Sequence, residues 1–279
     1  MAAHNENEAD PSSGLLNWLR ATLATYVLEP VAIYRPGMAQ DFPLKADNEE
    51  ELQAKLEKGG HFLPLPKEPA ALANIVEVAL VDFLVRAIEA TDDATITRGT
   101  ERGYPDVEIG GAAFGGGFHA VDVKVARRAK SLNLTESRIT LYTGNTYFRY
   151  PQLKWPGTFR PFQEYASHLD VIAIYTLNES RHGRIDDLEI IVHEPWRIAS
   201  KQRSSTTREY LGAVTRIQDL RDGKGEFATE AEFYNYWRKY SFKIGRVVQQ
   251  QLDKLLRAPA PGAESSAPAK ARKGKQGKT

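Results

Sequence analysis

The chain has 279 residues, of which 42% are hydrophobic, and a formal net charge of +1, which allows one large domain or two small ones with a sizeable core. It contains no cysteine, which excludes disulfides and thiolate metal sites and fits a reducing cytoplasm. The polar, acidic N-terminus is unlike a secretory signal, and no apolar run reaches the roughly 18 residues that a membrane span needs. We therefore expect a soluble cytoplasmic protein with no membrane partner.

Positive charge is concentrated in two segments. Residues 120–160 carry eight Lys or Arg against two acidic residues, and the tail from Pro259 carries five against one. A basic segment beside a carboxylate pocket would suit a polyanionic substrate such as nucleic acid. An ordinary solvated surface explains the same charges equally well.

The N-terminal part predicts elements without obvious chemistry. We expect residues 1–13 to be disordered. Apolar residues at helical spacing predict a helix over Leu15–Val27, and a short strand is expected over Val31–Tyr34. Asn48 with Glu51 forms a capping-box pattern that opens a short charged helix.

The next helix carries the first candidate site residue. Pro69 suits a first helical position, and an apolar stripe continues to Ile88. Glu77 interrupts the densest part of this stripe. A carboxylate among such neighbours is usually paired, protonated or near a metal. A helix-edge glutamate that reaches solvent is the simpler alternative.

The central motif is a pair of strands joined by a glycine-rich turn. Acidic and apolar side chains alternate over Asp106–Ile109, and a valine face alternates with polar residues over Val121–Val125. Pairing of the two strands would bring Asp106, Asp122 and Lys124 together on one face, opposite a buried one.

This arrangement has a chemistry. Two carboxylates about 4 Å apart repel by roughly 4 kcal/mol at an effective dielectric near 20. A proton, the Lys124 ammonium or a divalent cation must offset this repulsion, and hard oxygen ligands suit Mg²⁺. A lysine beside such a metal can position or help deprotonate the attacking water and offset charge on the pentacovalent phosphate, which fits phosphodiester hydrolysis. So short a pattern also recurs by chance, and a solvated hairpin with a strand salt bridge remains an alternative.

The middle of the chain predicts further strands. A strand over Arg138–Tyr142 leads to a polar turn whose Asn145 and Thr146, beside Arg149, could hold phosphates, although a plain turn explains them as well. We expect three more elements, namely a short helix over Phe162–His168, a central strand over Val171–Leu177 and a strand over Leu188–His193.

The C-terminal part contains a polar loop, two helices and a tail. The loop over Ala199–Tyr210 has little to bury, and its side chains are of the kinds that read base edges, although a mobile solvent loop is the alternative. The aromatic spacing over Phe233–Tyr240 indicates a helix that packs into the core. An amphipathic helix is expected over Val247–Leu256. The basic tail over 259–279 is expected to be disordered and could add non-specific DNA affinity.

These motifs together resemble the PD-(D/E)xK nucleases and, within them, the EcoRV-type restriction endonucleases. Fifteen residues separate Asp106 from Asp122, and Glu77 lies twenty-eight residues before Pro105, where that family has an additional helix carboxylate. The similarity extends over roughly Asn74–Tyr240 and includes four further segments: Thr140–Arg149, Pro161–Tyr165, Gly223–Phe227 and Glu232–Tyr240.

The resemblance implies an α/β fold with a mixed central β-sheet flanked by helices, in a restriction endonuclease domain over 14–258. It implies a homodimer that binds double-stranded DNA, bends it and cuts both strands at a palindromic site with Mg²⁺. Asp106 and Asp122 would be metal ligands, Lys124 the water-positioning group, and Glu77 an accessory acid and metal ligand.

By position, the resemblance also assigns two DNA-reading segments. The loop at Ser200–Tyr210 takes the place of the major-groove recognition loop, with Lys201, Gln202, Arg203, Ser204, Ser205, Thr206, Thr207 and Arg208. The stretch before Tyr104 takes the place of the minor-groove loop, with Thr100, Glu101 and Arg102. The glycines and asparagine of the family's first loop and the glutamines of its second are absent here. The resemblance therefore supports the catalytic chemistry and does not extend to the sequence specificity.

Two alternatives remain at this point. A repair or structure-specific nuclease on the same fold would cut branched or damaged DNA. A non-catalytic DNA-binding module would use the carboxylates structurally. The sequence leaves open the recognition site and whether the host has a cognate DNA methyltransferase.

Overall fold

The computed structural model describes residues 11–28, 46–59, 65, 67–100, 103–131, 133–144, 146–181, 183–206, 209–242 and 244–257. The chain divides into two compact units, Met1–Lys243 and Ile244–Thr279. The strand expected over Val31–Tyr34 and the tail from Pro259 lie outside the described residues. In the described part no helix is long and apolar enough to cross a bilayer.

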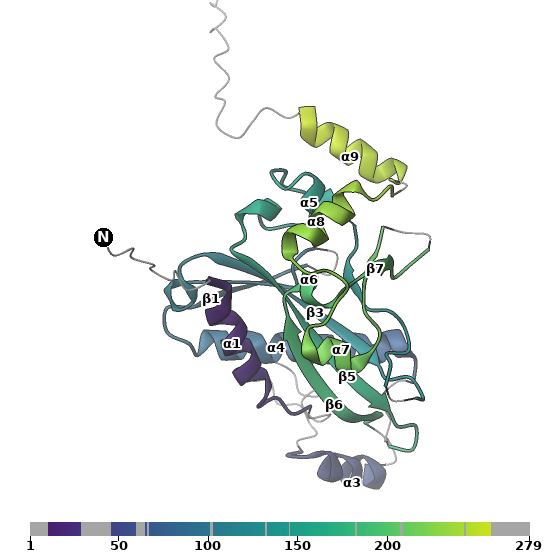
Figure 1. The fold of residues 1–279 in the computed structure, drawn as a ribbon. Coiled ribbons are helices and arrows are strands. Elements are labelled where there is room, and N and C mark those ends of the chain that lie inside the picture. Colours follow the sequence, from purple (N-terminus) through teal and green to yellow (C-terminus); the bar gives the residue numbers. More distant parts are fainter. Residues whose placement is uncertain are drawn as a thin grey trace, which may run out of the picture. The chain divides into compact units, whose positions relative to one another are not determined.

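A mixed five-stranded sheet forms the centre of the first unit, which confirms the predicted α/β class (Figure 1). Its strand order is β1-β2-β3-β5-β6; β3 and β5 are parallel and the other neighbours are antiparallel. Strand β5 is longer than predicted because it begins at Ser167. The strands are β1 (Thr95–Arg98), β2 (Val107–Gly110), β3 (Phe118–Arg127), β5 (Ser167–Leu177) and β6 (Ile185–His193).

A smaller sheet has the order β4-β8-β7, with β4 (Thr140–Tyr142), β8 (Leu211–Ala213) and β7 (Ala199–Arg203). The prediction of a loop over Ala199–Tyr210 was wrong for its first half, which is β7. The backbone there pairs with β8, and Ala199 and Ser200 are buried. The signal was missed because only two residues are buried before the exposed polar side chains begin.

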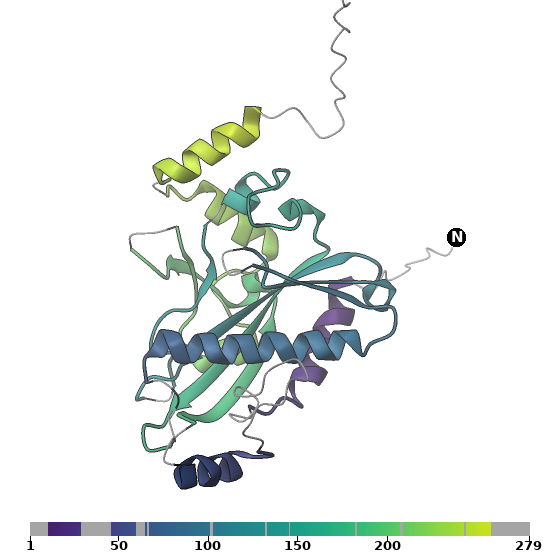
Figure 2. The same ribbon diagram turned by 180° about the vertical axis from the view of Figure 1, so that it is seen from behind.

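Helix α4 (Pro69–Glu89) packs on one face of the central sheet and is the long blue helix that crosses the sheet in Figure 2. Glu68 caps it by accepting a hydrogen bond from the Ala71 N–H at 2.8 Å, and Pro69 occupies the first turn as predicted. Its buried residues from Val76 to Ile88 join valines of β2 and β3 in one core cluster. Helix α3 (Glu49–Gly59) starts with the predicted Asn48 cap, which accepts from the Glu51 N–H.

Helix α1 (Pro11–Leu23) contributes buried leucines to the same cluster and contacts β6. It begins earlier and ends earlier than predicted. After Leu23 the chain turns, since the Thr25 N–H donates to the Thr22 carbonyl, and Tyr26 packs edge-on against Phe83 of α4. Tyr26 therefore continues the packing against the core without continuing the helix, whereas Val27 is 72% exposed.

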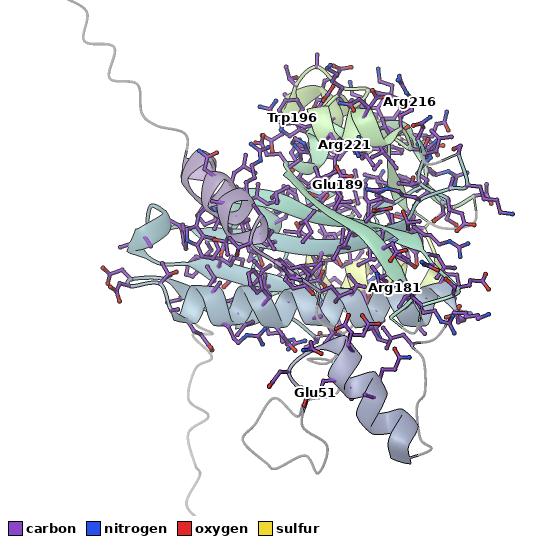
Figure 3. The ribbon with its side chains drawn as sticks, turned by 90° about the horizontal axis from the view of Figure 1, so that it is seen from below. Glu51, Arg181, Glu189, Trp196, Arg216 and Arg221 are labelled. Carbon is purple, nitrogen blue, oxygen red and sulfur yellow. The ribbon has the colours of Figure 1, made fainter. Side chains whose placement is uncertain are left out.

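A second core cluster lies against the opposite face of the central sheet and includes residues of the smaller sheet and α8 (Glu230–Lys239). Phe233 and Trp237 are completely buried in it, which confirms the predicted aromatic helix. The short helices of this unit are α5 (Thr146–Arg149), α6 (Pro195–Ile198) and α7 (Ile217–Asp222). Arg221 on α7 is joined to Glu189 on β6 by a hydrogen-bonded ion pair, and both are labelled in Figure 3.

The helix expected over Phe162–His168 was wrong beyond its first turn. Only Phe162–Glu164 is helical, as a single 3₁₀ turn. The Ala166 N–H then donates to the Phe118 carbonyl of β3 at 2.7 Å, which draws the chain into β5. In the second unit, α9 (Arg246–Arg257) confirms the predicted amphipathic helix.

Candidate active site

The antiparallel hairpin of β2 and β3 positions the candidate site. Val107 faces Val121 across the hairpin, and both belong to the core under α4. Because side chains alternate along a strand, Asp122 and Lys124 lie on the other face, the one on which Ala120 joins the second core cluster.

Asp106 lies directly before β2, and Asp122 lies in the middle of β3. The Asp106 N–H donates to Oδ1 of Asp122 at 3.2 Å, and the Val123 N–H donates to Oδ2 of Asp106 at 2.7 Å. Each carboxylate is therefore oriented by the backbone of the opposite strand.

The ammonium of Lys124 forms an ion pair with Asp122, with 2.5 Å between Nζ and Oδ2. Burial lowers the pKa of Lys124, but the charges on Asp122, Asp106 and Asp170 raise it more, so that it lies above its usual value. Lys124 is thus held protonated, as a donor rather than a base.

A cavity of about 500 Å³ opens onto these groups. Asp106, Asp122 and Lys124 line it, together with Glu77 from α4. Glu77 is half-buried, and burial, followed by a smaller effect of Asp122, raises its pKa despite the opposing charge of Lys124. The structure thus brings all four residues predicted for catalysis to one cavity.

The pKa of Asp106 differs from that of an ordinary surface aspartate. Burial and the repulsion of Asp122 raise the pKa of Asp106 to about 7, although Lys124 opposes the shift. In this arrangement the excess negative charge is reduced by a proton on Asp106 near neutral pH.

A fifth group near the site, Asp170, was missed by the sequence reasoning. It lies on β5 next to Asp122 in parallel register and is 2% exposed. Burial and the repulsion of Asp122 raise its pKa well above the usual value. The available signal was the alternation of polar His168 and Asp170 with apolar Leu169, directly before the apolar run of the central strand.

The donor set fits Mg²⁺, the metal that the family resemblance implies. Among the described residues no group of three or more His, Cys, Asp or Glu side chains could hold a metal ion by itself. Mg²⁺ is commonly bound through one or two carboxylates, with waters and substrate phosphate filling the remaining positions. Asp106 and Asp122 offer two such carboxylates at an open cavity, and Glu77 lines the same cavity.

Five of the predicted DNA-reading residues lie outside the described residues, namely Glu101, Arg102, Asn145, Thr207 and Arg208. Thr100 and Thr206 are exposed, and Arg149 and Ser205 are half-buried. Thr146 is 6% exposed at the start of α5, and its contact with phosphate stays a prediction.

The remaining residues of the predicted recognition loop have partners within the protein. Lys201 Nζ lies 3.4 Å from a carboxylate oxygen of Glu232. Ser204 shares a hydrogen bond of 2.7 Å with Thr140, and Arg203 lies over the ring of Tyr240.

Gln202 is linked to the catalytic cavity through Arg138. Arg138 lines the cavity and donates to Oε1 of Gln202 at 2.8 Å and to the Ala213 carbonyl at 2.6 Å. Gly212 makes room for this side chain, because a Cβ there would overlap the methylene groups of Arg138. The predicted reading segment is thus hydrogen-bonded to two residues that line the cavity, Gln202 to Arg138 and Ser204 to Thr140.

Comparison with known proteins agrees with this geometry. The family model described as "Restriction endonuclease EcoRV" matches residues 40–257. The chain is 22% identical over 197 residues to the type II restriction enzyme EcoRV of Escherichia coli, with 65% of this chain and 78% of that protein covered. The hairpin, its carboxylates and its lysine lie inside the matched region, and the chain belongs to the EcoRV restriction endonuclease family.

Proposed function

We propose that this protein is a type II restriction endonuclease that hydrolyses both strands of duplex DNA at a specific palindromic site with Mg²⁺. One observation carries the proposal: two carboxylates and a protonated lysine, drawn from neighbouring strands, meet at one open cavity. These are the groups that phosphodiester hydrolysis requires.

The residues have distinct roles in this proposal. Asp106 and Asp122 would hold Mg²⁺, which supplies Lewis acidity toward the phosphate when it is bound. Asp122 also orients Lys124 through their ion pair. The Lys124 ammonium has three donor hydrogens, and those not used by Asp122 can orient the attacking water and offset charge on the pentacovalent phosphate.

Glu77 would add a third carboxyl group to this site, from an element outside the hairpin. Its carboxyl group is carried by α4, which the core under the hairpin fixes in place. We propose that Glu77 acts as an accessory acid and a further oxygen ligand.

A double-strand cut at a palindrome needs one active site for each strand. We therefore propose a homodimer in which each protomer contributes one such cavity. The reading segments would be the polar end of β7 with the loop after it, and the stretch before Tyr104.

Digestion of a sequenced plasmid with Mg²⁺ tests the proposal. The expected result is a set of discrete fragments whose mapped ends share one palindromic sequence, with no cleavage in EDTA. Asp122→Ala should abolish cleavage while retaining the fold, as judged by circular dichroism. Asp186→Asn is a control, because Asp186 pairs with Arg181 and does not line this cavity.

Other outcomes point to other functions. Cleavage confined to branched or damaged DNA would overturn the site-specific function in favour of a structure-specific nuclease. DNA binding that is equal with and without EDTA, and never followed by nicking, would overturn the catalytic assignment.

A further inference from the structure

Arg138 is a cation of the catalytic cavity to which the proposed roles give no function. Among the described residues that line this cavity, the charged ones are Glu77, Asp106, Asp122, Lys124 and Arg138. The ammonium of Lys124 is paired with Asp122. The two hydrogen bonds of Arg138 go instead to neutral groups, the Ala213 carbonyl and the Gln202 amide oxygen. Within the described part of the chain, its positive charge is therefore not compensated by a carboxylate.

The local packing does not require a charge at this position. Arg138 is half-buried, and a half-buried charge without a counter-charge is unfavourable. A neutral amide side chain can donate hydrogen bonds to a carbonyl and to an amide oxygen without this cost. An anion that enters the cavity would supply the counter-charge. A ligand therefore explains the guanidinium better than the fold does.

The side chain of Arg138 is held in place by the smaller sheet. At Gly212 of β8 an added Cβ would lie 2.3 Å from Cδ and 2.8 Å from Cγ of Arg138. The arginine thus crosses β8 where no side chain projects, and reaches Gln202 on β7 at 2.8 Å. A side chain that is already fixed loses little conformational entropy when it binds a ligand. The arrangement is that of a preformed binding group.

The guanidinium of Arg138 has donors to spare. Its two bonds use two of the five N–H hydrogens of an arginine, and the contacts within the described residues leave the others free. Such a group can hold a phosphate through two parallel, charge-assisted hydrogen bonds. Ser137, the preceding residue, also lines the cavity, and hydroxyl groups commonly add to phosphate contacts. The chemistry of this wall therefore suits a phosphate.

We propose that Arg138 binds a phosphate of the DNA backbone that adjoins the phosphate to be cleaved. The inference rests on the proposed nuclease function and deepens it, because it assigns a substrate contact to a residue outside the hairpin. Lys124 and the two aspartates act on the reacting phosphate, whereas Arg138 enters the cavity from the smaller sheet. Arg138 thus contributes to the affinity for DNA before the reaction begins.

Binding of a random-sequence duplex in EDTA, followed by fluorescence anisotropy, tests this contact without cleavage. Arg138→Gln should weaken the affinity roughly 10-fold at low salt, as when a hydrogen bond to a charged group is lost. The slope of log K against log salt should become shallower by about 0.9, the value for one phosphate contact. Arg138→Lys should keep the wild-type slope, because an ammonium still binds phosphate as a point charge.

Arg216→Gln is the matched control for the loss of one positive charge. Arg216 is 68% exposed and does not line the cavity, so its variant should keep the wild-type slope. The same change of slope in Arg138→Gln and Arg216→Gln would overturn the contact. A wild-type slope in Arg138→Gln, with a lowered melting temperature in both the Gln and the Lys variant of Arg138, would reduce this residue to a tie between strands.

If Arg138→Gln does not fold, arginine modification of the wild-type protein decides. Phenylglyoxal reacts with accessible guanidinium groups, and mass spectrometry locates the modified residues. The bound duplex should slow the modification of Arg138 and leave that of Arg216 unchanged. Equal modification of Arg138 with and without the duplex would overturn the contact.

These experiments also separate the two proposals. A protein that binds the duplex through Arg138 and never cuts DNA would overturn the proposed nuclease function and support the contact. A protein that cuts DNA at one palindrome, while Arg138→Gln keeps the wild-type affinity and slope, would overturn the contact alone.

Discussion

Asp106 and Asp122 are tied together across the hairpin by the backbone, since the Asp106 N–H donates to Oδ1 of Asp122 at 3.2 Å. The repulsion between their charges therefore cannot be relieved by moving apart without breaking this bond. It is relieved by a proton, by Lys124 or by a cation, and each of these can be tested separately.

The proton on Asp106 predicts how stability depends on pH without metal. Its pKa is about 7 in the folded protein, against about 3.9 in an unfolded chain. Between these values the folded state holds a proton that the unfolded chain has released. The stabilisation of the folded protein by this proton is complete below about pH 4 and is lost as the pH rises through about 7. The free energy of unfolding then falls by at most about 1.4 kcal/mol per pH unit.

Urea unfolding in EDTA at several pH values measures this effect. Between about pH 4 and about pH 7 the free energy of unfolding should fall by about 4 kcal/mol more in the wild-type protein than in Asp106→Asn, because a slope of about 1.4 kcal/mol per pH unit acts over about 3 units. Carboxyl groups away from the site titrate in the same way in both proteins and cancel in the comparison. Equal slopes would show that Asp106 does not titrate in this range.

A variant without the Lys124 ammonium should cleave DNA more slowly and should have a higher pKa at Asp106. The charge of Lys124 lowers the pKa of Asp106, so Lys124→Met should raise that pKa further. Its cleavage rate should fall by roughly 10²- to 10³-fold, as when a charge-stabilising donor is removed. Carboxyl-carbon NMR titration and single-turnover cleavage measure the two effects.

Lys130→Met provides the control for Lys124→Met. Lys130 is an exposed lysine of the same basic segment, so its removal tests the general loss of one positive charge. A similar loss of cleavage in both variants would indicate that Lys124 acts through DNA affinity alone.

The catalytic hairpin could be predicted because the pattern of residues that specifies it lies within two short segments. The alternation over Asp106–Ile109 and Val121–Val125 places apolar and charged side chains on opposite faces, whatever the rest of the chain does. The aromatic spacing of α8 is local in the same sense. The core positions of Phe233 and Trp237 follow from helical geometry alone.

Other features depend on contacts between distant segments. Asp170 becomes a neighbour of Asp122 only through the parallel pairing of β3 and β5, and no periodicity within one strand encodes that register. Strand β7 was missed for the same reason, because the burial of Ser200 depends on its pairing with β8. Tertiary hydrogen bonding similarly converts the end of the expected helix after Glu164 into extended chain.

The buried pair of Arg160 and Glu108 predicts a large effect on stability away from the cavity. Arg160 donates twice, at 2.6 and 2.8 Å, to Glu108, which is 7% exposed. Arg160→Ala leaves that carboxylate buried without its partner and should cost about 3 kcal/mol. Arg160→Lys should lie between this variant and the wild-type protein, because an ammonium cannot form the two parallel bonds of a guanidinium.

Chemical denaturation of these variants measures the cost. Arg216→Ala is the control, since Arg216 is 68% exposed and its side chain lies 3.6 Å from that of Asp219; its loss should cost about 0 to 1 kcal/mol. Equal costs at Arg160 and Arg216 would show that the buried pair contributes no more than a surface pair.

The contact between Arg138 and Gln202 predicts a coupling between the catalytic cavity and the reading segment. Since Arg138 lines the cavity and holds the Gln202 side chain, removal of either group removes the same bond. A double-mutant cycle of Arg138→Ala and Gln202→Ala should therefore give a coupling free energy of about 0.5 to 3 kcal/mol in unfolding. The same cycle on cleavage rates should be non-additive only if the contact also transmits sequence recognition to the site. Additive effects on both stability and cleavage would show that the two side chains act independently.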